Sequence, residues 1–304
     1  MKRKAHSVMP SRLSQMKRAA AALIAAALLS PLPALAETVL ERIERTGELN
    51  AGTRVDAIPF SFPQADGQLD GLSVDVLREI RAATERRLGK PLELRLHAVT
   101  PANRIEKVRD GAVDLECAIT TPTWDRETAV DFSIPFFGNG TRILTMRGAA
   151  RAPEDFHGKR LGAVKGSTTT GILTTAAPGA QVIEVPDMAA GMAMLEKGEL
   201  DGLSNLGIVL RAQVEGSPLK SRVLLLPRTG AMSYESIACM LPKGDSEWRD
   251  LVNRAIADML EGIHSYRGTF MRIHDRWLGP AGPVFYPLDH AVADRLAASV
   301  IWLK

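Results

Sequence analysis

Short apolar runs alternate with stretches of helical period along the first part of the chain. The runs "ELNAGTRV", "LELRLHAV" and "VDLECAI" have the length and composition of β-strands. Between them, "LSVDVLREIRAATERRLG" and "NRIEKVRDG" place apolar residues at helical spacing and end in glycine. Strands that alternate with helices predict an α/β fold with mostly parallel sheets.

A second set of the same units follows further along the chain. "RLGAVKG", "QVIEVP", "DGLSNL" and "RVLLLP" are expected strands, and the segments between them have helical period. Two long extended runs, near residues 140–147 and 229–241, separate this set from its flanks. We therefore expect two lobes joined by two connecting strands, followed by the helix "SEWRDLVNRAIADMLEG" and a last helix that ends near "RWLG".

The first 36 residues have the order of a secretory signal peptide. A basic flank without acids precedes the 11-residue apolar run "AAAALIAAALL" and the small residues "ALA" at 34–36. A membrane span needs about 20 apolar residues, so this run is too short. We expect cleavage after residue 36 and secretion; an N-terminal membrane anchor or an amphipathic helix is the alternative.

Removal of this leader changes the charge of the protein. The leader contains six of the 38 Lys and Arg residues and none of the 35 acidic residues, so the remainder has a formal net charge of −3. No basic patch interleaved with aromatic residues remains, which argues against nucleic acid as a partner.

Cys117 and Cys239 are the only cysteines, and both lie in strand-like stretches. An even pair in an oxidising compartment favours one disulfide over a metal site, and two buried free thiols are the alternative. A bond between them would require the chain to return to the first lobe after the second connection. The first lobe would then consist of residues 37–145 and 232–304, and the second of residues 146–231.

The usual signatures of cofactors and catalysis are absent from the sequence. There is no GxGxxG after the first strand and no P-loop lysine motif, and no two of the six histidines lie four residues apart. "KGSTTTG" is not the GxSxG nucleophile motif. We therefore predict no cofactor, no metal and no catalytic residue.

Three arginines lie at or after the ends of expected strands: Arg54 ends the first, Arg104 follows the second and Arg126 follows the third. The carboxyl ends of strands in an α/β lobe meet at one crevice, and a guanidinium matches a carboxylate with two hydrogen bonds. The alternative is that each arginine is a surface residue paired with a nearby acid. Those acids are Asp56, Glu106 and Asp125.

Hydroxyl groups and a helix start add further donors. Thr120 and Thr121 follow the third strand, and "KGSTTTG" opens a helix whose free N–H groups suit an anion. Phe60 and Phe62 are expected to supply an apolar wall. Together these residues predict a cleft between two lobes for a small molecule with more than one carboxylate.

The sequence resembles the periplasmic amino-acid-binding proteins of ABC importers, and most closely the glutamate/aspartate-binding members. The resemblance runs from about residue 37 to about residue 278 and rests on motifs in a fixed order. These are "LERIERTGELNAGTR", "IPFSF", "GLSVDVL", "NRIEKVRDGAVDLECAITT", "DRETAVDFSIPFF", "GTRILT", "FHGKRLGAVKGSTTT" and "CMLPKG". It implies the type II periplasmic-binding-protein fold, with two α/β lobes on a two-strand hinge. It also implies a monomer that delivers its ligand to an inner-membrane permease, without enzymatic activity.

The resemblance assigns roles to particular residues. The arginine matching Arg126 grips the α-carboxylate of the ligand, with help from the residues matching Thr121 and Ser167. Those matching Arg54 and Arg104 hold the distal carboxylate, and the two cysteines also match. The residues expected to bind the ligand are Arg54, Phe60, Arg104, Ile119, Thr120, Thr121, Arg126, Gly166, Ser167, Thr168 and Asn205.

The chain departs from its relatives where the ligand ammonium is held. Pro101 replaces a serine, and Ile119 replaces a small or hydroxyl residue. Asn205 stands near the place of an expected acid, and Met188 near that of a polar contact. The carboxylate contacts are thus retained and the ammonium contacts weakened. This suggests that 2-oxoglutarate competes with glutamate better here than in ordinary relatives.

Two other functions remain open from the sequence. Some periplasmic enzymes with this scaffold are dehydratases acting on prephenate or arogenate, and these need a general acid in the cleft. Glu116 and Glu235 are candidates, although neither lies in a motif tied to that chemistry. The third possibility is a binding protein that presents its ligand to a membrane sensor.

Overall fold

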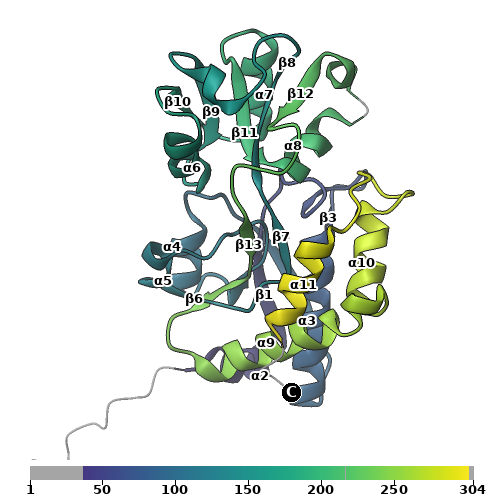
Figure 1. Ribbon diagram of the computed structural model, residues 1–304. Helices are drawn as coiled ribbons and strands as arrows, with labels where there is room; N and C mark the ends of the chain where they lie inside the picture. Colours follow the sequence, from purple (N-terminus) through teal and green to yellow (C-terminus); the bar gives the residue numbers. More distant parts are fainter. Residues whose placement is uncertain (1–36, 216, 301–304) are drawn as a thin grey trace, which may run out of the picture. The chain divides into compact units, whose positions relative to one another are not determined.

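Two five-stranded sheets and a pair of connecting strands organise the residues that the computed structural model describes, 37–215 and 217–300 (Figure 1). The expected signal peptide, residues 1–36, lies outside the described residues. Within the described ranges, no helix is both long and apolar enough to cross a bilayer.

The first sheet has the strand order β4-β1-β5-β14-β6. Strand β1 pairs in parallel with β4 and β5, whereas β14 runs antiparallel to β5 and β6. The strands are β1 (Glu48–Thr53), β4 (Glu93–Ala98), β5 (Leu115–Glu116), β6 (Val130–Phe132) and β14 (Met240–Pro242). Because β14 comes from late in the sequence, the chain returns to this sheet after building the second one.

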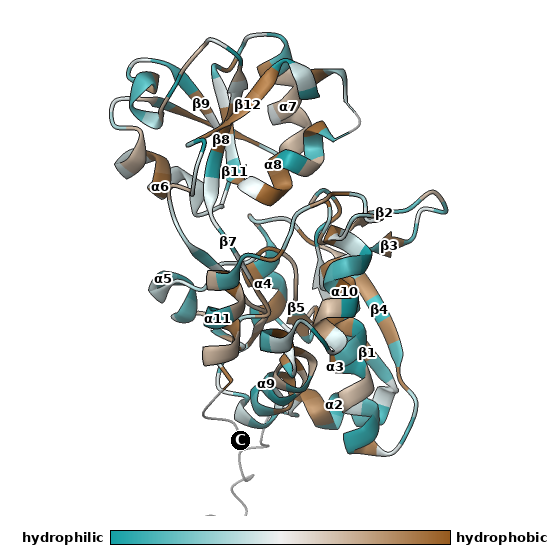
Figure 2. Cartoon of the chain, turned by 45° about the vertical axis from the view of Figure 1, so that its right-hand side comes forward, coloured by the Kyte–Doolittle hydropathy of each residue, from teal (hydrophilic) through white to brown (hydrophobic). Residues whose placement is uncertain are grey.

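Amphipathic helices accompany the first sheet. Helix α3 (Leu72–Leu88) buries Leu72, Val76, Leu77 and Ile80, spaced at helical period, and ends where Gly89 adopts a φ of +68°. Most of the helices in Figure 2 carry both hydrophilic and hydrophobic stretches, as expected when only part of each helix is buried. The others are α2 (Val39–Thr46), α4 (Arg104–Arg109), α5 (Trp124–Glu127), α9 (Ser246–Leu260), η3 (Ile263–Ser265), α10 (Thr269–Leu278) and α11 (His290–Ala298); a small hairpin joins β2 (Phe62–Pro63) and β3 (Leu69–Asp70).

The second sheet has the strand order β10-β9-β11-β8-β12. Its strands are β8 (Thr141–Met146), β9 (Arg160–Val164), β10 (Gln181–Val185), β11 (Gly202–Leu206) and β12 (Val223–Leu226). Every residue of β11 is buried, as expected for a central strand with both faces covered. The helical segments of this part are η1 (Pro153–Phe156), α6 (Thr169–Ala176), α7 (Met188–Glu196), α8 (Gly207–Val214) and η2 (Pro218–Ser221).

Strands β7 (Phe137–Asn139) and β13 (Glu235–Ile237) connect the two sheets and pair antiparallel with each other (Figure 1). The two-lobed fold with a two-strand hinge is confirmed. A Cβ at Gly140 would lie 2.2 Å from the Ser233 carbonyl oxygen, so the close approach of the two connections requires glycine. Because β8 already belongs to the second sheet, we propose that the chain leaves the first lobe at Gly140 rather than at residue 145.

A disulfide joins Cys117 and Cys239, as the sequence predicts. Cys117 follows β5 and Cys239 precedes β14, which is the neighbouring strand in the first sheet, and both side chains are fully buried. The bond spans 122 residues of sequence, a segment that contains the whole second sheet. The first lobe is therefore built from two separate pieces of the chain that are covalently closed at their junction.

Candidate functional site

A small cavity lies where loops of both lobes meet the hinge. Its volume of about 20 Å³ leaves room for about one water molecule. Its wall includes loops that follow β1, β4 and β5, the start of α6, the end of β11 and the hinge strand β13. The lining residues are Arg54, Pro101, Arg104, Ile119, Thr121, Arg126, Ser167, Thr168, Thr169, Asn205, Leu206 and Glu235.

Most of the residues expected to bind ligand line this cavity. The exceptions are Phe60, Thr120 and Gly166. Phe60 is fully buried and packs edge-on against the Phe137 ring, with 5.3 Å between the centroids. The hydroxyl of Thr120 is also fully buried and donates to Glu116 behind the wall. Gly166 contributes only its carbonyl oxygen, which accepts a hydrogen bond from Arg126 at 3.0 Å.

Arg126 connects the two sides of the cavity. It lies on the short helix α5, which begins where the Thr123 hydroxyl caps the Arg126 N–H. Its guanidinium donates to the Thr121 carbonyl oxygen at 2.7 Å and to Gly166. Among the described residues, no carboxylate lies within 4.0 Å of it. Burial lowers the pKa of Arg126, and the more distant Glu116 and Glu235 oppose that shift.

Arg104 is buried beside the cavity, with 2% of its surface exposed. Burial lowers its pKa to about 10, Glu116 opposes this, and the fields of Arg126 and Arg54 add to it. Its Nη1 donates to Thr120 and lies 3.9 Å from a Glu116 oxygen. Its Nε is buried without a hydrogen-bond partner among the described residues. This cluster of positive charge suits an anion.

Of the three arginines, Arg54 pairs with an acid close to it in the sequence. Its Nε and Nη2 donate to the two oxygens of Asp56, at 2.7 and 2.6 Å. Burial opposes ionisation of Asp56, but Arg54 and the Met188 N–H outweigh it and lower its pKa. Over the described residues, neither Glu106 nor Asp125 forms an ion pair with Arg104 or Arg126. Of the three arginines, Arg54 alone pairs with its nearby acid, and it does so as a buried residue rather than at the surface.

Two buried acids complete the electrostatics of the site. Glu116 is fully buried beside Arg104; burial raises its pKa, and Arg104, Thr120 and the other arginines oppose the rise. Glu235 lines the cavity from β13 and was not among the expected ligand contacts. The available signal was an acid inside the extended, largely apolar run "SYESIACMLPKG".

The residues that depart from the relatives form a less polar side of the cavity. The amide nitrogen of Asn205 donates to the Met188 sulfur at 3.1 Å, and its amide oxygen accepts the Leu206 N–H. Pro101 packs on the loop before α6, where a Cβ at Gly166 would lie 3.0 Å from the Pro101 oxygen. The Ser167 hydroxyl is buried there without a partner among the described residues.

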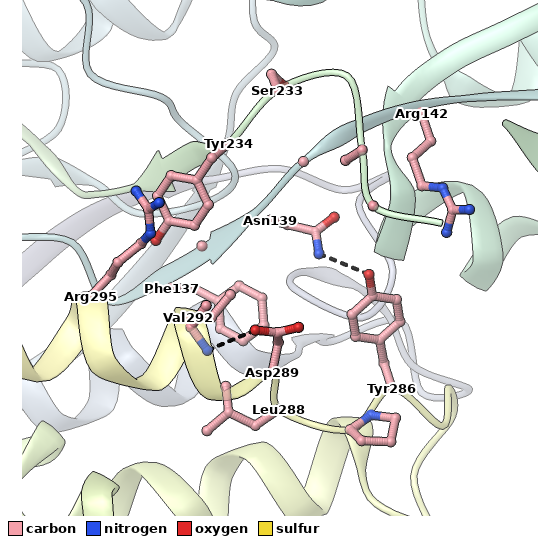
Figure 3. Close-up of a pocket in the computed structure, with 16 residues that line it drawn as sticks. Phe137, Asn139, Arg142, Ser233, Tyr234, Tyr286, Leu288, Asp289, Val292 and Arg295 are labelled. Atoms are coloured by element: carbon pink, nitrogen blue, oxygen red, sulfur yellow. Dashed lines mark hydrogen bonds between the residues drawn. The ribbon is translucent and has the colours of Figure 1, made fainter. Parts of the chain in front are cut away.

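A roomier cavity of about 360 Å³ is lined in part by residues of the hinge strand β7 and of the segment before β13 (Figure 3). Here Asn139 donates to the Tyr286 hydroxyl at 3.1 Å, and Arg295 of α11 lies 4.3 Å from the centre of the Tyr234 ring. None of the expected ligand residues lines it. No group of His, Cys, Asp and Glu residues able to hold a metal occurs in the described part of the chain.

Residues 49–280 match the family model described as bacterial extracellular solute-binding proteins, family 3. The L-glutamate/L-aspartate-binding protein of Pseudomonas aeruginosa is 30% identical over 295 residues, covering 90% of this chain and 92% of that protein. The glutamate/aspartate import solute-binding protein of Escherichia coli is 27% identical, with coverage of 93% and 96%.

Solved structures agree with the fold. An ancestral arginine-binding protein bound to glutamine superimposes with a TM-score of 0.67 and 27% identity, covering 77% of this chain and 98% of that one. A solute receptor for L-cysteine from Neisseria gonorrhoeae superimposes with a TM-score of 0.69 at 23% identity, over 78% of this chain and 92% of that one. At that identity the second likeness bears on the fold alone.

Proposed function

Because the chain belongs to the bacterial extracellular solute-binding proteins, family 3, we propose that it captures an acidic amino acid, or a related dicarboxylate, for an ABC permease. The observation that carries this proposal is the convergence of Arg54, Arg104 and Arg126 on one cavity. A ligand with two carboxylates provides partners for such a cluster. Two relatives named for glutamate and aspartate, from Pseudomonas aeruginosa and Escherichia coli, support the same ligand class.

The proposed binding mode divides the ligand between the three arginines. Arg126 receives the α-carboxylate, because it is the arginine without an ion pair among the described residues and its donors already span both lobes. The buried hydroxyl of Ser167 lies on the same wall and is available as a further donor. Arg104, with its unpartnered Nε, and Arg54 receive the distal carboxylate.

Admission of the ligand requires the lobes to separate. A cavity of about 20 Å³ is far smaller than an amino acid, and hydrogen bonds cross it from Arg126 to Gly166 and from Thr168 to Glu235. The two connecting strands β7 and β13 provide a hinge for such a motion. We propose that ligand binding replaces these direct contacts and that the closed form is recognised by the permease.

The proposed location is the periplasm. A basic flank, a short apolar run and "ALA" before residue 37 form the leader that would direct secretion. The disulfide between Cys117 and Cys239 suits an oxidising compartment. We propose that the mature protein acts as a monomer there and binds its ligand without converting it.

A thermal-shift screen of the mature protein, with amino acids and small carboxylates, tests this function. We expect glutamate, aspartate or a related dicarboxylate to raise the midpoint of unfolding, because a ligand that binds only the folded state stabilises it. Arginine and leucine serve as controls and should leave the midpoint unchanged. Stabilisation by arginine or leucine, with none by any acid, would contradict the proposal. Incubation with prephenate tests the dehydratase alternative, and no product is expected.

A further inference from the structure

The cavity contains one buried acid that has no cation beside it. Glu235 is 5% exposed, and among residues 37–215 and 217–300 no Lys, Arg or His nitrogen lies within 4.0 Å of its carboxylate. A carboxylate taken out of water is costly unless it is paired or well hydrogen-bonded. Glu235 therefore offers a charge that a bound cation can compensate.

Four hydroxyl groups hold the Glu235 carboxylate in place. Its Oε2 accepts hydrogen bonds from Thr121 at 2.9 Å and from Thr168 at 2.5 Å. Its Oε1 accepts from Thr141 and, at 3.2 Å, from Ser233. These donors come from the first lobe, the second lobe and the hinge, so the position of the carboxylate is defined from several sides. They are neutral donors and leave the negative charge of Glu235 uncompensated.

The geometry of Thr121 brings this anion close to the unpaired cation of the site. The Thr121 carbonyl oxygen accepts from Arg126 at 2.7 Å, while its hydroxyl donates to Glu235 at 2.9 Å. Both charged side chains line the same cavity, and each lacks a counter-ion within 4.0 Å in the described part of the chain. An α-amino acid carries a carboxylate and an ammonium on one carbon, and this pair of opposite charges is complementary to it.

We propose that Glu235 is the anionic partner of the ligand's α-ammonium group and thereby makes the site selective for amino acids over plain dicarboxylates. This inference rests on the proposed function. The acid comes from the hinge strand β13, whereas the resemblance led us to expect one near the position of Asn205. Asn205 cannot take this role in the observed arrangement, because its oxygen is engaged by the Leu206 N–H and it carries no charge.

The proposal reverses the ligand preference expected from the sequence. That expectation assumed that no acid reaches the ammonium position, and it favoured 2-oxoglutarate as a competitor. With Glu235 in the cavity wall, a ligand without an amine leaves the buried carboxylate uncompensated. Glutamate should therefore bind more tightly than glutarate, which has the same two carboxylates and no amine.

The test is calorimetric titration of glutamate and glutarate into wild-type protein and Glu235→Gln. This variant keeps the size of the side chain and removes its charge. We expect it to weaken glutamate binding by about ten- to a hundredfold, the usual range for loss of a charged hydrogen-bond partner. Glutarate binding should stay the same or become tighter.

Glu116→Gln is the matched control, because Glu116 is also a buried glutamate but faces Arg104. It should change the affinities for glutamate and glutarate by the same factor. Adding Asn205→Asp to Glu235→Gln should restore part of the preference for glutamate.

Equal weakening of both ligands in Glu235→Gln would overturn the inference, since a purely structural role predicts that outcome. If Glu235→Gln does not fold, the wild type decides: equal affinity for glutamate and glutarate overturns the inference, and a preference for glutamate supports it. Wild-type protein that binds neither ligand contradicts the proposed function itself.

Discussion

Arg126 and Arg104 are charged side chains whose burial favours the binding of an anion. Burial lowers the pKa of both guanidinium groups, that of Arg104 to about 10, so each remains charged at neutral pH at some cost. The guanidinium of Arg126 donates hydrogen bonds to backbone oxygens, and these carry no full negative charge to compensate its positive charge. In the complex that we propose, the carboxylate of the ligand would provide that compensation and would offset part of the free-energy cost of burial.

Replacement of Arg126 by Ala should weaken binding of an acidic amino acid by about tenfold to over a hundredfold. The reason is the loss of a charge-assisted, two-bond contact to a carboxylate. Arg126→Lys should recover only part of the loss, because an ammonium lacks the planar fork. Calorimetry measures both, with Arg222→Ala, an exposed arginine, as the control. Unchanged affinity in Arg126→Ala would show that the carboxylate binds elsewhere.

Asp114 predicts a pH effect on stability. Burial raises its pKa to about 6, although the Asn50 N–H and Arg42 oppose the rise. Between about pH 4 and pH 6 the folded state therefore binds more protons than the unfolded state, so this group lowers the unfolding free energy as pH rises. Asp114→Asn lacks this titration. As pH rises from 4 to 7, the unfolding free energy of the variant should increase by about 2–3 kcal/mol relative to that of the wild type.

Urea unfolding at several pH values measures this difference for Asp114→Asn. Asp66→Asn, at an exposed turn, is the control and should follow the wild-type curve. Parallel pH dependences for wild type and Asp114→Asn would show that Asp114 titrates normally in the folded protein.

At the level of elements, the sequence pattern predicts the strands and helices better than it predicts which sheet each strand joins. The runs that became β1, β4 and β9 to β12 were all expected as strands, because their apolar composition determines local structure. The lobe boundary was placed at residue 145 and we propose Gly140 instead; the run "TRILTM" has the composition of a strand and does not indicate which sheet it joins. Helix α5 was not expected from the sequence, because its four residues are too few to show a helical period.

In the candidate site, too, the sequence predicts residues at strand ends better than it predicts residues placed by long-range pairing. Eight of the eleven expected ligand residues line the cavity, because strand ends converge in this fold. Glu235 was not expected as a ligand contact, because its position depends on the pairing of β13 with β7, and about a hundred residues of chain separate Asn139 from its partner Glu235. Phe60 does not line the cavity, because an aromatic side chain next to a site residue can equally face the core, where Phe60 packs on Phe137.

The disulfide makes a prediction about the junction of the first lobe. Closing a loop of 122 residues restricts the unfolded chain, which corresponds to roughly 4–5 kcal/mol on the chain-entropy model and often less in practice. Cys117→Ser with Cys239→Ser should lower the unfolding free energy by up to that amount in urea. Wild-type protein denatured without reductant should contain no titratable thiol. Two free thiols would contradict the disulfide.

At the level of the whole molecule, closure and recognition depend on the same residues. Arg126 and Thr121 belong to the first lobe, Gly166 and Thr168 to the second, and Glu235 to the hinge between them. Hydrogen bonds link all three parts across a cavity that holds about one water. A ligand that satisfies the same groups would therefore favour the closed form, which couples ligand binding to the shape offered to a permease.

Calorimetric titration of the wild-type protein with glutamate and with glutamine tests the central claim most directly. The two ligands share their α-carbon groups and differ only in the distal carboxylate, which we assign to Arg54 and Arg104. A neutral amide removes the charged partner that the distal carboxylate would give these two guanidinium groups, so glutamine should bind at least about tenfold more weakly than glutamate. Glutamine binding as tight as glutamate binding would contradict the account.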